Sequence, residues 1–272
     1  MSLFIQPTKN EYVHIEHRDW GAHWTIQFPE VLECSAGTIM AWPLIQPDWQ
    51  RCGANAWGYT WRPPADYVQQ VAALNLTTTD GQPQYSRFVP DAELRAQIAV
   101  NGPAIELALT VTNLGHQPLR KLHSDGGCFQ AKSEAFRDGD EVARSYIMSG
   151  GKMTSLAQLH RTEPIRCCYT TDPTARDTRA GEWFWGRTTA VVDAPVVVGA
   201  ISRDGQQAVV LGYEQATEAL TNADEGHHCL HSGPWFGDLL PGQSATRRGW
   251  ILFGKDLHSL ARELTRRLTT PA

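Results

Sequence analysis

The chain has 272 residues, of which 42% are hydrophobic and 19% charged, as is usual for a globular protein with a proper core. Lys and Arg number 24 against 29 Asp and Glu, and the net charge of −5 comes with no basic stripe, which argues against nucleic acid as a partner. No apolar run is long enough to cross a membrane and no signal-peptide pattern is seen, so we expect one cytoplasmic domain over residues 1–272 without membrane partners.

The first helical pattern in the chain lies near residues 64–74. Pro64 stands at its start, where the N–H that proline lacks is not needed by the helix. Tyr67, Val71 and Leu74 fall on one face at helical spacing. We therefore expect a short helix here, with one side turned to the core.

Strand patterns dominate the middle and the end of the chain. Residues 105–111 alternate apolar and polar side chains, and residues 119–123 continue the pattern after a turn at Asn113 to Gly115. Asp204-Gly205 separates two β-rich runs at 194–201 and 207–213, which predicts a hairpin. Short strands and turns continue to Phe253, and this spacing favours a mostly β protein built as a two-sheet antiparallel supersandwich.

The chain closes with a second helix, predicted over residues 256–268. Asp256 is a suitable N-terminal cap, and the apolar residues Leu257, Leu260, Leu264 and Leu268 form one stripe. We read this segment as a helix that packs on the sandwich.

Ten tryptophans are many for this length, and several stand beside Gly, Pro or Arg, as ring side chains on a concave rim often do. Rings in such places can stack on the apolar face of a sugar, and a neighbouring guanidinium can bind its polar groups. An equally good interpretation is that these rings only seal the ends of the sandwich. The proposed substrate-binding residues are Trp61, Arg62, Trp183, Trp185, Arg187 and Trp235.

The densest group of reactive side chains is the run from His227 to His231. In a strand, His227, Cys229 and His231 share one face and His228 points to the other. This is a pattern compatible with a divalent metal, although neighbours two apart lie roughly 6.6–7 Å apart along a strand. The alternatives are catalytic histidines, here His228 and His231, or imidazoles that are simply hydrogen-bonded. No other cofactor is expected, and the six cysteines are interpreted as free thiols.

A second group, His123-Ser-Asp125-Gly-Gly, stands at the end of a predicted strand. A histidine and an aspartate at a Gly-rich strand end can form a proton-transfer pair. A turn in which the aspartate bonds to backbone is the alternative.

The segment from Val111-Thr-Asn113 through Pro118 to His123 resembles the galactose-mutarotase-like superfamily, in which a strand ending in Thr-Asn precedes one that carries a sugar-contacting histidine. The late segment with Pro241-Gly242 leading into a final long strand is similar to the same fold. The run from Cys229 to Leu239 is also similar to a group of uncharacterised bacterial proteins of about this size. The resemblance covers about residues 105–253.

The resemblance implies a β-supersandwich that acts on a small carbohydrate or glycoside. His123 matches the first histidine, and His228 or His231 is the second; Glu214, Glu218 and Glu225 are the glutamates whose position suits the base. The aromatic-Asn pair of the family after the first histidine is replaced here by Ser124-Asp125, which departs from simple mutarotases.

Three hypotheses follow for the function. The first is a proton-transfer enzyme of the epimerase, mutarotase or lyase type with a histidine acid/base. The second is a non-catalytic carbohydrate-binding or accessory protein, and the third is a metal-assisted lyase or glycoside-cleaving enzyme. Fold alone does not choose among them, and the sequence does not give the oligomeric state.

Overall fold

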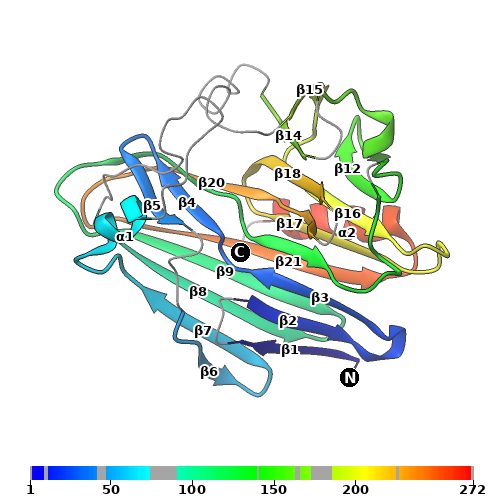
Figure 1. Ribbon diagram of the computed structural model, residues 1–272, viewed down its shortest axis with the longest axis horizontal. Coiled ribbons are helices and arrows are strands. Elements are labelled where there is room, and N and C mark those ends of the chain that lie inside the picture. Colours follow the sequence, from blue (N-terminus) through cyan, green and yellow to red (C-terminus); the bar gives the residue numbers. More distant parts are fainter. Residues whose placement is uncertain are drawn as a thin grey trace.

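Two β-sheets stacked face to face make up most of the chain in the computed structural model (Figure 1). The structure describes residues 2–8, 12–41, 47–73, 91–139, 141–162, 166–172, 186–224 and 227–270. Among the described strands, every pair is antiparallel except β14 with β15. The mostly β, two-sheet class expected from the sequence is therefore confirmed, with one parallel pair added.

The larger sheet has 12 strands, and its main path runs β1-β2-β3-β11-β19-β18-β20-β10-β4-β5, with β14 pairing to β18 and β15 to β14. Its strands are β1 (Leu3–Pro7), β2 (Tyr12–His17), β3 (Ala22–Gln27), β4 (Val31–Cys34), β5 (Gly37–Ala41), β10 (Leu119–Ser124), β11 (Cys128–Ala131), β14 (Arg166–Thr170), β15 (Gly186–Val191), β18 (Ala216–Asp224), β19 (His227–Leu230) and β20 (Gly233–Leu239).

The smaller sheet has nine strands in the order β13-β12-β16-β17-β21-β9-β8-β7-β6. Its strands are β6 (Gln50–Gly53), β7 (Ala56–Trp61), β8 (Ala92–Asn101), β9 (Ala104–Asn113), β12 (Ser145–Ser149), β13 (Lys152–Ser155), β16 (Val197–Ile201), β17 (Ala208–Tyr213) and β21 (Ser244–Gly254). The predicted hairpin is confirmed as β16 and β17, which pair antiparallel.

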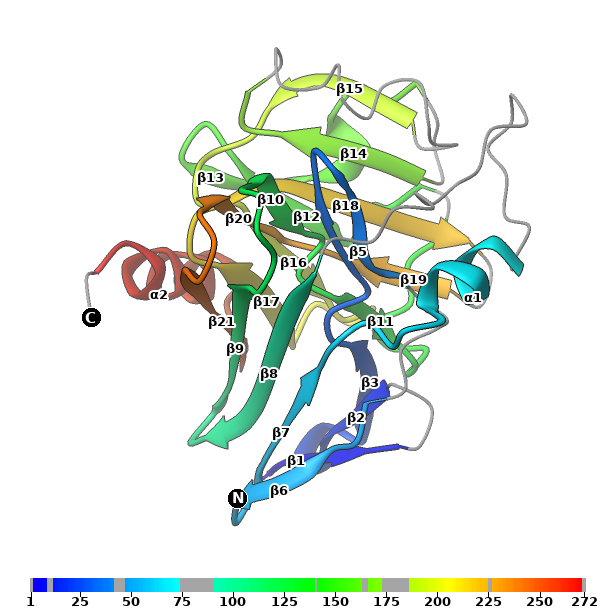
Figure 2. The ribbon, with the colours of Figure 1, turned by 90° about the vertical axis from the view of Figure 1, so that its left-hand side faces the viewer.

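The main core lies between the sheets and follows from strict alternation in the long strands. In β9, Ile105, Leu107 and Leu109 are buried while the residues between them are not fully so. Strands β8 and β21 pair with β9 over nearly its whole length, so these side chains meet the inner face of the larger sheet. Figure 2 shows β7 and β8 of the smaller sheet facing β2 and β3 of the larger one.

Two α-helices complete the described fold. Helix α1 (Tyr67–Ala73) begins later than residue 64 because the Pro64 carbonyl accepts the Tyr67 N–H in a turn, and Leu74 lies outside the described residues. Helix α2 (Leu257–Thr269) is capped by Asp256 as predicted, and its apolar stripe packs on the outer face of the smaller sheet (Figure 1). Two short 3-10 turns lie at Arg18–Trp20 and Leu156–Gln158. None of the described helices is both long and apolar enough to cross a bilayer.

Candidate functional site

Three neighbouring strands of the larger sheet are interrupted at the same level. Strands β3, β11 and β19 pair on one side of the interruption, and β4, β10 and β20 pair on the other. Strand β18 is continuous and pairs with both β19 and β20. We call the interruption the seam; it consists of residues 28–30, 125–127 and 231–232. Each of its three segments contributes one ionisable side chain, namely Glu30, Asp125 and His231.

The local sequence explains why the strands break here. Pro29 stands between β3 and β4 and has no N–H for the ladder. Gly126 and Gly127 both have positive φ, and a Cβ on Gly126 would collide with the Ser232 carbonyl of the neighbouring segment. The chain can therefore cross the seam between β10 and β11 only because glycine occupies these positions.

Side chains replace the missing ladder hydrogen bonds at the seam. The Ser124 hydroxyl donates to the Val31 carbonyl at 2.8 Å, and the Val31 N–H donates to the Asp125 carboxylate at 3.2 Å. The Tyr213 hydroxyl reaches across from the smaller sheet and donates to the Gly126 carbonyl at 2.7 Å. Buried backbone groups need such partners, so these contacts fix the seam and the position of Asp125.

Glu30, Asp125 and His231 form an acid–imidazole cluster at the seam. The His231 Nδ1 lies 3.6 Å from an Asp125 oxygen and 3.8 Å from a Glu30 oxygen, and only 3% of the His231 side chain is exposed. Burial of the carboxyl group and, next in size, the charge of Asp125 raise the pKa of Glu30 to about 8. Burial alone would lower the pKa of His231, but the Cys128 sulfur and the two acids raise it well above its ordinary value. The cluster can thus hold a proton that isolated side chains would not hold.

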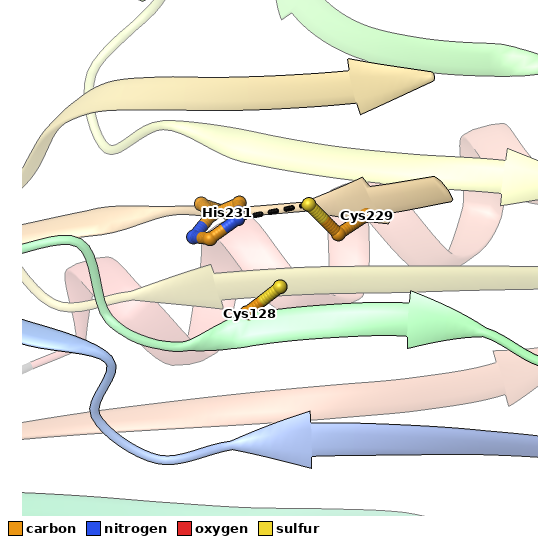
Figure 3. A group of neighbouring side chains, drawn as sticks. All are labelled: Cys128, Cys229 and His231. Atoms are coloured by element: carbon orange, nitrogen blue, oxygen red, sulfur yellow. Dashed lines mark hydrogen bonds between the residues drawn. The ribbon is translucent and has the colours of Figure 1, made fainter. Parts of the chain in front are cut away.

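The Cys229 thiol lies against the other nitrogen of the same imidazole, and the Cys128 thiol extends towards them from the neighbouring strand (Figure 3). The Sγ of Cys229 is 3.1 Å from the His231 Nε2, and the Sγ of Cys128 on the next strand belongs to the same compact group of donor atoms. The Gln130 amide donates to the Cys128 sulfur at 3.1 Å, and the His227 Nε2 lies 3.5 Å from it. Burial raises the pKa of the Cys128 thiol well above its ordinary value.

A more accessible group lies on the other side of the seam. Glu33, His123 and Trp235 are aligned across β4, β10 and β20 by the register of the strands. The His123 Nε2 is 3.5 Å from a Glu33 oxygen, and the His123 ring lies nearly parallel to the Trp235 ring at 6.0 Å. The side chains of His123 and Glu33 keep 20% and 17% exposure, although the His123 Nε2 atom itself is buried. We call these three residues the open triad.

The open triad and the seam cluster are joined by very short stretches of chain. Asp125 follows His123 by two residues, and Glu33 follows Glu30 by three. Glu33, His123 and His231 lie on the outer face of the larger sheet, because Leu32, Leu122 and Leu230 occupy the core face. Glu30 and Asp125 lie beside His231, within 4 Å of its Nδ1. The sequence-predicted residues His123, Asp125, His231 and Trp235 are thus brought to one region of this sheet.

The structure places other predicted residues elsewhere. His228 points to the core face, as the alternation predicted, and its ring nitrogens contact the Ser145 hydroxyl at 3.1 Å and the Asp138 N–H at 3.4 Å. Burial lowers the pKa of His228 to about 4, which suits a neutral structural imidazole. Trp61 and Arg62 lie at the end of β7 in the smaller sheet, where Arg62 pairs with a glutamate.

Three further predicted residues are only partly covered by the structure. Trp183 and Trp185 lie outside the described residues. Arg187 is placed in β15 beside Cys168, and its side chain is not described.

The three glutamates considered for the base differ in their positions. Glu214 is engaged by Arg248 in an ion pair at 2.5 Å, so it is a structural residue. Glu218 lies on the outer face of β18, packed over Gly233, where a Cβ would meet its side chain at 2.7 Å. Glu225 lies outside the described residues.

Sequence reasoning missed Glu30, Glu33 and the pairing of Cys128 with Cys229. Glu33 could have been found, because alternation in Val31–Cys34 puts its side chain on the other face of the strand from that of buried Leu32. Glu30 and Cys128 gave no such signal, because their neighbours come from strands that are distant in the sequence.

Comparisons with known proteins give a likeness of fold. No family model and no curated protein matches the sequence. A glycosyl hydrolase family 38 protein from Enterococcus faecalis aligns with a TM-score of 0.51 at 10% identity, over 98% of this chain and 31% of that one. The chain thus spans about a third of that protein, and it shares the fold of this part.

Two smaller proteins also align, with lower scores. A galactose mutarotase-like protein from Lactobacillus casei aligns at TM-score 0.47 and 9% identity over 92% of this chain and 99% of that one. An aldose epimerase homologue from C. elegans aligns at TM-score 0.45 and 8% identity over 93% and 98%. The galactose-mutarotase-like fold that the sequence resemblance implies agrees with the two-sheet architecture described above.

Proposed function

We propose that this protein is a carbohydrate-active enzyme that moves a proton on a small sugar or sugar derivative, by an epimerase, mutarotase or lyase type of reaction. His123 is the general acid/base, Glu33 is its carboxylate partner, and Trp235 carries the sugar ring. The observation that supports this proposal most directly is the open triad itself. It combines a partly exposed imidazole, a carboxylate 3.5 Å away and a parallel indole on one sheet face.

The hydrogen bonding of His123 suits a base. Its Nδ1 lies 2.9 Å from the Lys121 carbonyl, which can only accept, so the neutral ring carries its proton on Nδ1. The Nε2 atom then faces the Glu33 side of the triad, where it is buried and has no hydrogen-bond partner among the described residues, so a sugar that binds there must reach it from the side of Trp235 or Glu33. Nε2 can take a proton from a sugar hydroxyl or from a carbon beside a carbonyl, and return it to another atom of the same sugar.

Glu33 assists this step through its charge. When Nε2 gains a proton, the new imidazolium lies 3.5 Å from the Glu33 carboxylate, which stabilises it. The carboxylate also offers acceptor oxygens to sugar hydroxyls, which are donors in need of such partners. The Trp235 ring provides a flat apolar surface beside the imidazole for the CH groups of the ring.

The proposal is tested with free aldoses, keto-sugar glycosides and uronate oligosaccharides as substrates. Anomer exchange and solvent deuterium incorporation are followed by NMR, and lyase products by their absorbance. We expect His123→Gln to lower kcat at least about 100-fold on any active substrate, as for the loss of a general base. Glu33→Gln should lower kcat less, and Trp235→Leu should mainly raise KM.

Matched controls separate chemistry from stability. His258→Gln and Glu134→Gln change exposed residues away from the open triad and should leave activity as in wild type. Absence of turnover on every substrate, together with glycan affinity unchanged in His123→Gln, would reject the enzyme and support the non-catalytic binding protein.

A further inference from the structure

We propose that Cys128, Cys229 and His231 bind a zinc ion. One donor atom from each residue lies within 4.8 Å of the others, and the three side chains are 0%, 1% and 2% exposed. Two thiolates and an imidazole are the donors that Zn²⁺ prefers among the biological divalent cations. Figure 3 shows the Cys128 side chain extending from its strand towards the neighbouring one that carries the other two residues.

The strand register explains why these side chains converge. Gln130 pairs with Cys229 and Phe129 with Leu230, so the same register continued by one step sets Cys128 opposite His231. Cys229 and His231 are two residues apart in the sequence, so their side chains lie on the same face. His231 is already in the seam, between the end of β19 and the start of β20. The neighbouring strand therefore supplies the third donor that a single flat strand could not bring close enough.

The surroundings are those of a metal-bound histidine. Its Nε2 faces the thiols while its Nδ1 faces the Asp125 carboxylate at 3.6 Å, and ligating histidines generally donate this second N–H to a carboxylate. The Gln130 amide donates to the Cys128 sulfur, and Lys132 holds the amide oxygen at 2.5 Å, which fixes the orientation of the donor. Hydrogen bonds of this kind stabilise a thiolate sulfur.

Charge balance favours the same assignment. Two thiolates buried without a cation would be very costly, whereas one Zn²⁺ neutralises both and forms the bonds. A nucleophilic role for Cys229 fits the burial poorly, because substrate would have to reach a sulfur on a residue that is 1% exposed. A closed environment with thiolate ligands is typical of zinc sites that stabilise a fold.

A second group, Glu30, Asp125 and His231, offers oxygen donors at the opposite nitrogen of the same ring. Hard cations such as Mg²⁺ or Mn²⁺ would prefer it. One neutral imidazole keeps a proton on one nitrogen, so binding zinc through Nε2 leaves Nδ1–H to donate to the carboxylates. We therefore assign the metal to the sulfur side.

The test uses the full chain, purified without an affinity tag and without chelator from cells supplied with zinc. Elemental analysis should give about one zinc per chain, as a stoichiometric structural site requires. Replacement by Co²⁺ should produce the intense near-ultraviolet band of thiolate-to-cobalt charge transfer together with tetrahedral visible bands. This measurement needs no variant, so it does not depend on whether a substituted chain folds.

Variants locate the site. Cys128→Ser and His231→Gln should retain less than about a tenth of the metal, consistent with losing one of three ligands. Cys167→Ser, which changes an equally buried thiol on the core face of β14, should retain it fully. Circular dichroism of each variant shows whether it is folded.

Four results would overturn the proposal: substoichiometric zinc, cobalt spectra without the thiolate band, equal metal loss in Cys167→Ser, or a disulfide between Cys128 and Cys229 in protein kept free of oxidants. The readouts are metal content and spectra, so the outcome is independent of any activity on sugars.

Discussion

The hydroxyl of Tyr213 is expected to stabilise the seam by an amount that can be measured. The Tyr213 side chain is fully buried, and its hydroxyl donates to the Gly126 carbonyl at 2.7 Å. Tyr213→Phe keeps the ring, which packs over Gly249 and beside Phe28, and removes only the donor. The Gly126 carbonyl is then left buried without this partner, which costs about 2 kcal/mol. For a chain of 272 residues, that corresponds to a lowering of Tm by roughly 3–4 °C.

Urea unfolding followed by tryptophan fluorescence measures this loss, and the ten tryptophans provide the signal. Tyr146→Phe is the matched control, because Tyr146 is half-buried and its hydroxyl has no hydrogen-bond partner among the described residues. We expect the control to lie within about 0.5 kcal/mol of wild type. Equal unfolding free energies for Tyr213→Phe and wild type would refute the view that side chains replace the ladder at the seam.

Three further predictions concern other parts of the molecule. Burial lowers the pKa of His17, so the unfolded chain takes up the proton more readily than the folded chain, and stability should fall as the pH drops below about 6.5. His17→Phe should make that part of a Tm-against-pH curve less steep, and His228, whose pKa is lowered to about 4, accounts for slope that remains. Gly233→Ala would place a Cβ 2.7 Å from the Glu218 side chain and 2.9 Å from the Ser124 carbonyl, so it should lower the free energy of unfolding in urea, while Gly139→Ala, in open space, should not. Asp256→Ala removes the cap on the Ser259 N–H and should cost about 1 kcal/mol in urea unfolding.

Local patterns predicted the elements of the fold well. The alternation in residues 105–111 and the Asp-Gly turn between β16 and β17 depend only on residues that are close in the sequence. Both predictions are confirmed. The capped, striped helix at the C-terminus is confirmed for the same reason. Only the helix near residue 64 was placed too early, since a proline-initiated turn precedes it.

The site could be predicted only in part. Strand alternation correctly separated His228 from its neighbours His227 and Cys229. The members of the open triad come from β4, β10 and β20, and Cys128 and Cys229 come from β11 and β19. The register between strands so distant in the chain leaves no periodic signal. This is why Cys128 was not grouped with Cys229, whereas the face on which Glu33 lies could be read from the alternation in Val31–Cys34.

The seam has a consequence for how the larger sheet tolerates sequence change. A one-residue slip in an ordinary strand turns every following side chain to the opposite face. Here β3, β11 and β19 are anchored by their own ladder, and β4, β10 and β20 by another. A change of register in one half therefore has no ladder of these six strands through which to pass into the other half, and β18 is the strand that pairs with both.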